Sequence, residues 1–107
     1  MYTENKAVEA KQAGEGTTRK VLSYSKDMML CELHFEKGAV GAVHAHPHEQ
    51  IGYIVSGRLI YQEEGKLDKE LGTGDCYQVA PNVRHGVKIL EPTVLIDIFT
   101  PMREDFV

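Results

Sequence analysis

Turn-forming residues recur at short intervals along this chain, and their spacing constrains its fold more than any other feature. Ten glycines and four prolines interrupt the sequence. Turn signals lie at Gly14-Glu15-Gly16, Ser25-Lys26-Asp27, Lys37-Gly38, Ser56-Gly57, Glu64-Gly65-Lys66, Gly72-Thr73-Gly74-Asp75, Ala80-Pro81-Asn82 and Glu91-Pro92. The segments between them have the length of strands, and such regular spacing is typical of an all-β sandwich or barrel.

Several of these segments alternate in the manner of strands that bury one face. One face of residues 28–35 would carry Met29, Cys31, Leu33 and Phe35. One face of residues 83–90 would carry His85, Val87 and Ile89. Residues 94–99 are apolar on both faces except at Asp97, which predicts a buried strand. Residues 3–12 have a helix-compatible composition but are too few and too weakly patterned to form a stable helix.

Composition and charge exclude several classes of protein. The length of 107 residues suggests one domain. The net charge is −4, and the basic residues are scattered, so a nucleic-acid backbone binder is not expected. No apolar run reaches the roughly 18 residues of a membrane helix, and no apolar signal-peptide segment follows the first residues. Cys31 and Cys76 stand outside any Cys-x-x-Cys, which predicts reduced core thiols in a cytoplasmic protein.

Histidines gather in the segment 38–50. Residues two apart on an extended chain point the same way, so His44, His46, His48 and Gln50 would share one side of a regular strand. Pro47 favours a bend or bulge there. Two imidazoles about 6–7 Å apart along a strand can converge on one ion. His85 is the one distant histidine that faces inward beside apolar neighbours, and it could bring a third imidazole. The alternative is a group of surface histidines in a loop, which is our expectation for His34 and His48.

The spacing of the two histidine segments resembles the two motifs of the cupin family. The first is Gly38-x5-His44-x-His46-x3-Gln50-x6-Gly57, with Gln50 where the family usually has glutamate. The second is Gly74-Asp75-x4-Ala80-Pro81-Asn82-x2-His85. Here Ala80 replaces the first proline, Asn82 replaces the usual glycine, and Ile89 stands where the motif ends in asparagine. Because asparagine tolerates a left-handed backbone, Asn82 can replace that glycine at low cost.

The resemblance implies a small jelly-roll β-barrel, an all-β single-domain cupin, with one divalent metal at its centre. It predicts one domain over 1–107, with the metal-binding barrel core at about 19–101 and a segment 1–18 of uncertain structure. The ligands it implies are His44, His46, Gln50 and His85. A nitrogen-rich site suits Ni, Zn, Fe, Mn or Cu, and these stay open. Glu49 should point outward; its binding in place of Gln50 through a bulge is the alternative.

A second group of residues lies near the C-terminus. Asp97 interrupts an apolar strand and shares a face with Leu95 and Phe99. A carboxylate in such a place should be paired, hydrogen-bonded or functional. An Asp97–Arg103 ion pair that closes the barrel is one interpretation, and a catalytic role for Asp97 is the other.

The ending Ile96-Asp97-Ile98-Phe99-Thr100-Pro101-Met102-Arg103-Glu104-Asp105-Phe106 resembles the KdgF family of pectin-degradation cupins. The similarity runs from about Arg19 to the last residue. That family converts 4,5-unsaturated monouronates, released from pectin or alginate, into linear 5-keto-4-deoxyuronate. The functional residues it implies here, besides the ligands, are Asp97, Phe99 and Arg103.

Each of these three residues suits a step of that reaction. Arg103 would hold the substrate carboxylate in a bidentate fork. Asp97 is the candidate acid–base group, because desolvation could raise its pKa into a useful range. Phe99 would form a wall for the sugar, although it could equally be plain core. Tyr53 and Tyr61 are further candidate donors at the barrel mouth.

Other functions remain open at this point. A small metal-dependent cupin could instead be a dioxygenase or a sugar isomerase. A sugar- or effector-binding module without catalysis, or a metal-bound structural barrel, would share the same residues. We expect a small-molecule sugar acid as the partner and no nucleic acid or membrane. Exposed faces such as Ile96/Ile98 suggest a partner sheet, and the resemblance to small cupins implies a homodimer.

Overall fold

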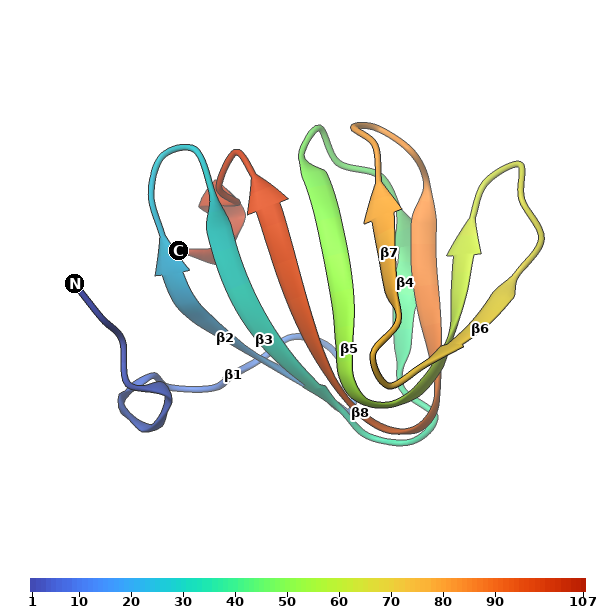
Figure 1. The fold of residues 1–107 in the computed structure, drawn as a ribbon, viewed down its shortest axis with the longest axis horizontal. Coiled ribbons are helices and arrows are strands. Elements are labelled where there is room, and N and C mark those ends of the chain that lie inside the picture. Colours follow the sequence, from blue (N-terminus) through green and yellow to red (C-terminus); the bar gives the residue numbers. More distant parts are fainter.

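The computed structural model describes all residues 1–107, and strands dominate it (Figure 1). The strands are β1 (Lys11–Gln12), β2 (Thr17–Tyr24), β3 (Met29–Phe35), β4 (Val40–His44), β5 (Glu49–Glu63), β6 (Lys69–Gly72), β7 (Cys76–Val79) and β8 (His85–Thr100). Two short 3₁₀ turns lie at η1 (Asn5–Ala7) and η2 (Glu104–Phe106). None of the helices is long or apolar enough to cross a membrane. The all-β prediction is confirmed, and residues 3–12 form no α-helix.

The sheet is one antiparallel system that folds over on itself. The strand order is β1-β2-β3-β8-β5-β6, with β4 also pairing with β8 and β7 with β5. β5 and β8 are the longest strands, with 15 and 16 residues. Both curve through the closed end of the structure in Figure 1, so each contributes to both layers of the fold. Side chains on the concave side therefore meet between the layers, as in a jelly roll.

Two of the expected turns are bends inside these long strands. Ser56-Gly57 lies within β5 and Glu91-Pro92 within β8, so the prediction that they end strands was wrong. Gly57 has φ +106°, and a Cβ on it would lie 2.7 Å from Thr93 Cα. The register between the strands shifts near this point. Left-handed glycine and a proline without an N–H group here produce a bulge that bends a continuous ladder.

The alternation in the sequence is reproduced in the core. Met29, Cys31, Leu33 and Phe35 are buried on β3, and His85, Val87 and Ile89 on β8. Residues 94–99 are buried on one face only. Leu95, Asp97 and Phe99 point inward, whereas Val94, Ile96 and Ile98 are half-buried on the outer face. The expectation of a strand buried on both sides is thus corrected.

The two cysteines differ in environment. Cys31 is fully buried in β3, whereas Cys76 is exposed on β7, so only one of the two expected core thiols lies in the core. Both are free thiols. Burial raises the pKa of Cys31 to about 12, with the charge of Asp97 acting in the same direction. Cys31 is therefore an inert packing residue.

Candidate metal centre and adjoining cavity

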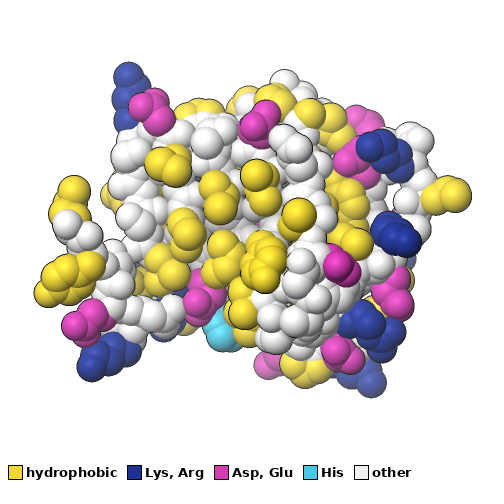
Figure 2. Space-filling model, viewed as in Figure 1, with side chains coloured by type: hydrophobic (Ala, Val, Ile, Leu, Met, Phe, Trp, Pro, Cys, Tyr) yellow, Lys and Arg dark blue, Asp and Glu magenta, His cyan; other side chains and the backbone are white.

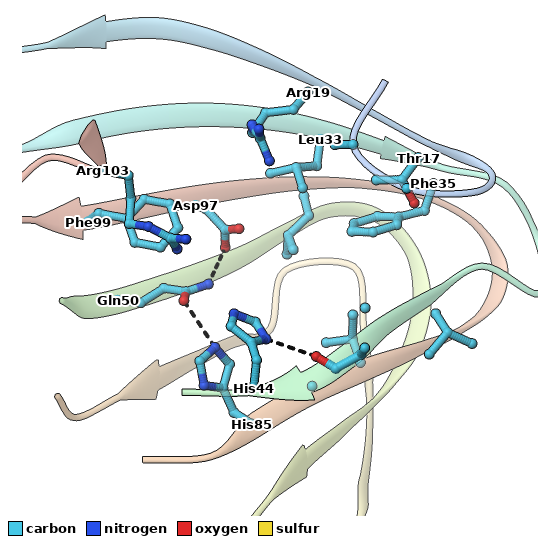
Figure 3. Close-up of a pocket in the computed structure, with 18 of the residues that line it drawn as sticks. Thr17, Arg19, Leu33, Phe35, His44, Gln50, His85, Asp97, Phe99 and Arg103 are labelled. Carbon is cyan, nitrogen blue, oxygen red and sulfur yellow. Dashed lines mark hydrogen bonds between the residues drawn. The ribbon is translucent and has the colours of Figure 1, made fainter. Parts of the chain in front are cut away.

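A cavity of about 430 Å³ lies between the two layers of the barrel. Its walls come from β2, β3, β4, β5, β7 and β8 and from the C-terminal segment. Figure 3 shows His44 and His85 at one end, Gln50 and Asp97 in the middle, and Arg19 at the other end. The sequence motifs that are far apart in the chain thus meet in one space.

Three histidines converge at one end of this cavity. His44 ends β4 and pairs in register with His85, which begins β8, and His46 follows in the β4–β5 connection. The ring centroids lie 4.7 Å apart for His44–His85, 4.9 Å for His46–His85 and 5.4 Å for His44–His46. One ring nitrogen from each lies within 4.8 Å of the other two. This group of three imidazoles could hold a metal ion.

Backbone carbonyls set the tautomer of all three rings. A carbonyl oxygen only accepts hydrogen bonds, so each imidazole nitrogen facing one must be Nδ1–H. The acceptors are Ala42 O at 2.8 Å from His44, His48 O at 3.0 Å from His46 and Val83 O at 3.0 Å from His85. The Nε2 lone pairs are then free to bind a cation. Metal-ligating histidines in proteins are commonly oriented by this kind of second hydrogen bond.

Gln50 completes the group with an oxygen. Gln50 Nε2 donates to Asp97 Oδ1 at 2.9 Å, which turns Gln50 Oε1 toward the imidazoles. That oxygen lies 2.9 Å from His46 Nε2 and 3.2 Å from His85 Nε2. With Nδ1–H tautomers, His46 Nε2 and His85 Nε2 carry lone pairs and no hydrogen. Both nitrogens therefore face Gln50 Oε1 as acceptor against acceptor.

Such an arrangement of acceptors requires a positive species between them. Burial lowers the pKa of both His46 and His85, and the neighbouring imidazoles act in the same direction, so protonation of the rings is disfavoured. A divalent ion bound by three imidazoles and one amide oxygen would satisfy all of the lone pairs. The donor set therefore fits a metal of the kind that accepts nitrogen ligands.

The turn before His85 helps to position this group. Asn82 has φ +66°, the left-handed conformation that the sequence predicted for it. Its backbone N–H donates to His46 O at 2.7 Å. The second motif thereby attaches to the first through the backbone, next to the imidazoles.

Asp97 lies in the middle of the cavity wall. It is 7% exposed and pairs in register with Gly52 of β5. Burial raises the pKa of Asp97 to about 6, while the hydrogen bond from Gln50 and the charge of Arg103 oppose this rise. A carboxyl group with such a pKa exchanges protons readily near neutral pH.

Arg103 does not form the ion pair with Asp97 that sequence reasoning had considered. Its Nε and Nη2 atoms donate to the two oxygens of Asp105, at 3.0 Å and 2.7 Å. The guanidinium lies 5.1 Å from the Phe99 ring centroid and 4.2 Å from that of Phe106. Arg103 and Phe99 both line the cavity, although Phe99 is also 2% exposed and part of the core.

The remaining sequence candidates separate into different environments. Glu49 is exposed, as predicted, and it is Gln50 that faces the imidazoles. His34 is exposed and lies 2.8 Å from Glu32. His48 is half-buried rather than a surface residue, because its ring packs against Phe99 at 6.4 Å between centroids. Its Nδ1 is buried without a hydrogen-bond partner.

The sequence analysis offered Tyr53 and Tyr61 as hydrogen-bond donors at the barrel mouth and did not identify Tyr77. Tyr53 is exposed on the outer face of β5, and the Tyr61 hydroxyl donates to Glu63 at 2.7 Å. The cavity is instead lined by Tyr77, whose ring stacks on Tyr61 at 4.4 Å. A Cβ on Gly52 would lie 2.7 Å from Tyr77 Cε1, so glycine is needed there. Alternation in 76–79 was the signal that could have identified Tyr77.

Comparisons with known proteins identify the family and the fold of the chain. The family described as Cupin domain matches residues 31–99. The pectin degradation protein KdgF of Dickeya dadantii (strain 3937) is 43% identical over 97 residues, which cover 89% of this chain and 87% of that protein. The structure of KdgF from a Halomonas species has a TM-score of 0.94 at 33% identity and full coverage of both chains. An RmlC-like cupin from Shewanella frigidimarina NCIMB 400 also has a TM-score of 0.94, at 38% identity, with 99% of this chain and 95% of that chain covered.

Proposed function

Since the chain belongs to the cupin family, and within it to the KdgF proteins, we propose that it is an enzyme that converts 4,5-unsaturated monouronates into linear 5-keto-4-deoxyuronate. Such sugar acids arise when pectin or alginate is degraded. The observation that carries the proposal is one cavity in which a candidate metal centre, a carboxyl group of raised pKa and two arginines face the same space.

The reaction is an isomerisation, so its atoms balance without a co-reactant. The substrate is a cyclic hemiacetal with a C4=C5 enol ether and a carboxylate. Cleavage of the bond between C1 and the ring oxygen, with loss of the C1 hydroxyl proton, yields an aldehyde at C1 and an enolate at C5. The enolate then takes up a proton at C4, which produces the ketone. The site must therefore hold the carboxylate, stabilise charge on oxygen and move a proton.

The candidate metal ligands are His44, His46, Gln50 and His85. A divalent ion bound there would act as a Lewis acid that stabilises negative charge on a substrate oxygen without redox change. Gln50 contributes no charge, whereas a glutamate would contribute one negative charge. With these ligands a bound divalent ion would keep its full double positive charge. Ni, Zn, Fe, Mn and Cu all suit this donor set.

Asp97 is the proposed acid–base group. It is the ionisable carboxyl group in the cavity wall, and the hydrogen bond from Gln50 Nε2 holds one of its oxygens. The second oxygen remains to take the proton from a substrate hydroxyl and return it to C4. A pKa of about 6 gives both protonation states useful populations near neutral pH. Phe99 forms the adjacent wall of the cavity, and Arg103 contributes positive charge near the carboxylate of the substrate.

The test is turnover of the substrate itself. Metal-loaded protein mixed with an unsaturated monouronate is expected to speed the loss of the enol-ether absorbance above the spontaneous rate. Proton NMR should identify the linear keto acid as product, and an oxygen electrode should record no uptake. Oxygen consumption would indicate a dioxygenase, and tight binding without turnover would indicate a binding module; either result contradicts the proposal.

We also propose a homodimer through the outer face of β3, β8 and β5. The exposed apolar side chains on this face are Met28 (55% exposed), Ile51 (40%), Tyr53 (45%) and Val55 (44%). Leu30 of β3, Ile98 of β8 and Ile51 of β5 lie side by side in register between them. Figure 2 shows hydrophobic side chains gathered over the middle of this face. A contiguous apolar patch of this kind is typical of a protein interface.

The Tyr53→Lys variant tests the dimer. A lysine in the centre of a buried apolar interface would lose its solvation, so the substitution should convert the dimer into a monomer. Light scattering coupled to size-exclusion chromatography measures the mass directly. Leu67→Lys is the matched control, because Leu67 is 95% exposed in the β5–β6 connection, away from this face. A monomeric wild-type protein, or a dimeric Tyr53→Lys protein, would contradict the proposal.

A cytoplasmic location is part of the same proposal. Cys31 and Cys76 are both free thiols. Unpaired cysteines are usual in the reducing cytoplasm and uncommon in secreted proteins.

A further inference from the structure

Arg19 projects from β2 into the same cavity, at the end opposite the histidines (Figure 3). Its guanidinium carbon lies 3.5 Å from the centroid of the Phe106 ring. The side chain makes no ion pair and no hydrogen bond within the protein. The one buried side-chain nitrogen without a partner is His48 Nδ1, so the Arg19 donors are open to the cavity or to water.

Arg103, which carries the second guanidinium of the cavity, already has a hydrogen-bond partner. Arg103 uses Nε and Nη2 to bind both oxygens of Asp105. This is the edge of the guanidinium that recognises a carboxylate with two parallel hydrogen bonds. A second carboxylate therefore finds a complete donor fork on Arg19 but only the remaining donors of Arg103.

Phe106 holds the two cations near one another. Its ring lies against Arg19 at 3.5 Å and against Arg103 at 4.2 Å. Burial lowers the pKa of Arg19 and the charge of Arg103 acts in the same direction, whereas Cys31, Asp105 and Asp97 oppose this shift. An arginine guanidinium stays protonated at neutral pH. Because Asp105 already pairs with Arg103, the charge left without a partner is that of Arg19, and an anion in the cavity would pair with it.

The order of groups along the cavity matches the order of groups in a sugar acid. A uronate carries its carboxylate (C6) on C5; C4 and the ring oxygen are the ring neighbours of C5, and the hemiacetal carbon C1 lies beyond the ring oxygen. With the carboxylate at Arg19, the C4=C5 bond next to it would lie toward the middle of the cavity, where Asp97 stands. The C1 end would then point toward the histidines.

We infer that Arg19 is the residue that binds the carboxylate of the substrate and selects sugar acids over neutral sugars. This assignment rests on the proposed function, and it moves the bidentate contact from Arg103 to Arg19. Arg103, stacked on Phe106 and tied to Asp105, then acts as a positive neighbour that holds the aromatic wall and the anion site in place.

Direct binding measures this role without turnover. D-galacturonate and its neutral methyl ester, two sugars that lack the reactive C4=C5 bond, are titrated calorimetrically into metal-loaded protein. We expect the wild-type protein to prefer galacturonate. Arg19→Gln should weaken galacturonate binding at least about tenfold, the range of a charge-assisted hydrogen-bonded pair, and leave the ester unchanged. Arg19→Lys should fall between the two, because it keeps the charge and loses the fork.

Arg58→Gln is the matched control, because Arg58 is an exposed arginine that pairs with Glu70 at 3.0 Å. It should bind both sugars like the wild-type protein. The inference is overturned if wild-type protein does not prefer galacturonate, if Arg19→Gln binds it within twofold of wild type, or if the variant loses the ester to the same extent.

Turnover then separates this inference from the proposed function. Arg19→Gln should raise the KM for an unsaturated monouronate at least about tenfold and change kcat much less, because a remote binding contact is lost. If the wild-type protein shows no turnover but its galacturonate binding depends on Arg19, the proposed reaction fails and the anion site stands. If turnover proceeds with an unchanged KM in Arg19→Gln, the anion site fails and the reaction stands.

Discussion

The Asp97→Asn variant is expected to lose at least about 100-fold in kcat while it keeps its metal. General acid–base catalysis by a positioned side chain contributes about 10²–10⁴-fold, and asparagine cannot carry the proton. The amide oxygen of asparagine can still accept the hydrogen bond from Gln50, so the ligand oxygen Gln50 Oε1 should keep its direction. Steady-state kinetics and elemental analysis of the same sample measure the two effects.

The same variant should be more stable than wild type when both are metal-free. The folded-state pKa of Asp97 is raised to about 6 from an ordinary value of 3.8, so the stability that Asp97 contributes is present below pH 4 and lost as the pH rises through 6. Asparagine has no such dependence. At pH 7 the free energy of unfolding of Asp97→Asn should therefore exceed that of wild type by up to about 3 kcal/mol, and the gap should close toward pH 4.

Glu49→Gln is the control for these measurements. Glu49 is an exposed carboxylate beside Gln50 in sequence, and its side chain points away from the cavity. The kcat and the free energy of unfolding of Glu49→Gln should match those of the wild-type protein. Full activity in Asp97→Asn would remove Asp97 from the mechanism, and an unchanged pH profile of stability would show that its pKa is not raised.

The second large effect is expected from His44→Ala. His44 is the exposed member of the three histidines, so its removal costs little packing, whereas it deletes one of the proposed ligands. The affinity for a divalent metal should fall at least about 100-fold, because even residues that only orient a ligand contribute 10–100-fold. Mass spectrometry after dialysis should find well under one metal ion per chain.

His34→Ala controls for the loss of an imidazole as such. His34 is exposed on β3 and pairs with Glu32, far from the other rings. Its metal content should equal that of the wild-type protein. If His44→Ala binds metal as fully as His34→Ala does, the proposed set of ligands is wrong.

Most of the strands could be predicted from local sequence patterns. The bends at Gly57 and Pro92 could not, and they show what local patterns leave open. The alternation in 29–35 and 85–89 required only a period of two, which any half-buried strand has. The bends at Gly57 and Pro92 were misread as turns, because a left-handed glycine and a missing N–H favour a turn and a bulge equally. The neighbouring strand decides between them, since β5 and β8 remain paired on both sides of the bend.

Some features of the candidate site could likewise be predicted from the sequence, and others could not. The spacing of His44 and His46 and the inward position of His85 were readable in the sequence. The carbonyls that set their tautomers were not, because they depend on how the connecting segments fold back. Arg19 was missed for a related reason: its inward orientation follows from the pairing of β2 with β3, in which Arg19 stands opposite the buried Leu33.

The measurement that tests the central claim most directly is turnover as a function of metal occupancy. Protein stripped with a chelator is reloaded in steps, and the initial rate of linearisation of an unsaturated monouronate is measured at each step. We expect the rate to rise in proportion to bound metal up to one ion per chain, and the product to be the linear keto acid. A rate equal to the spontaneous one at full occupancy, or a stripped protein as active as the loaded one, would contradict the account.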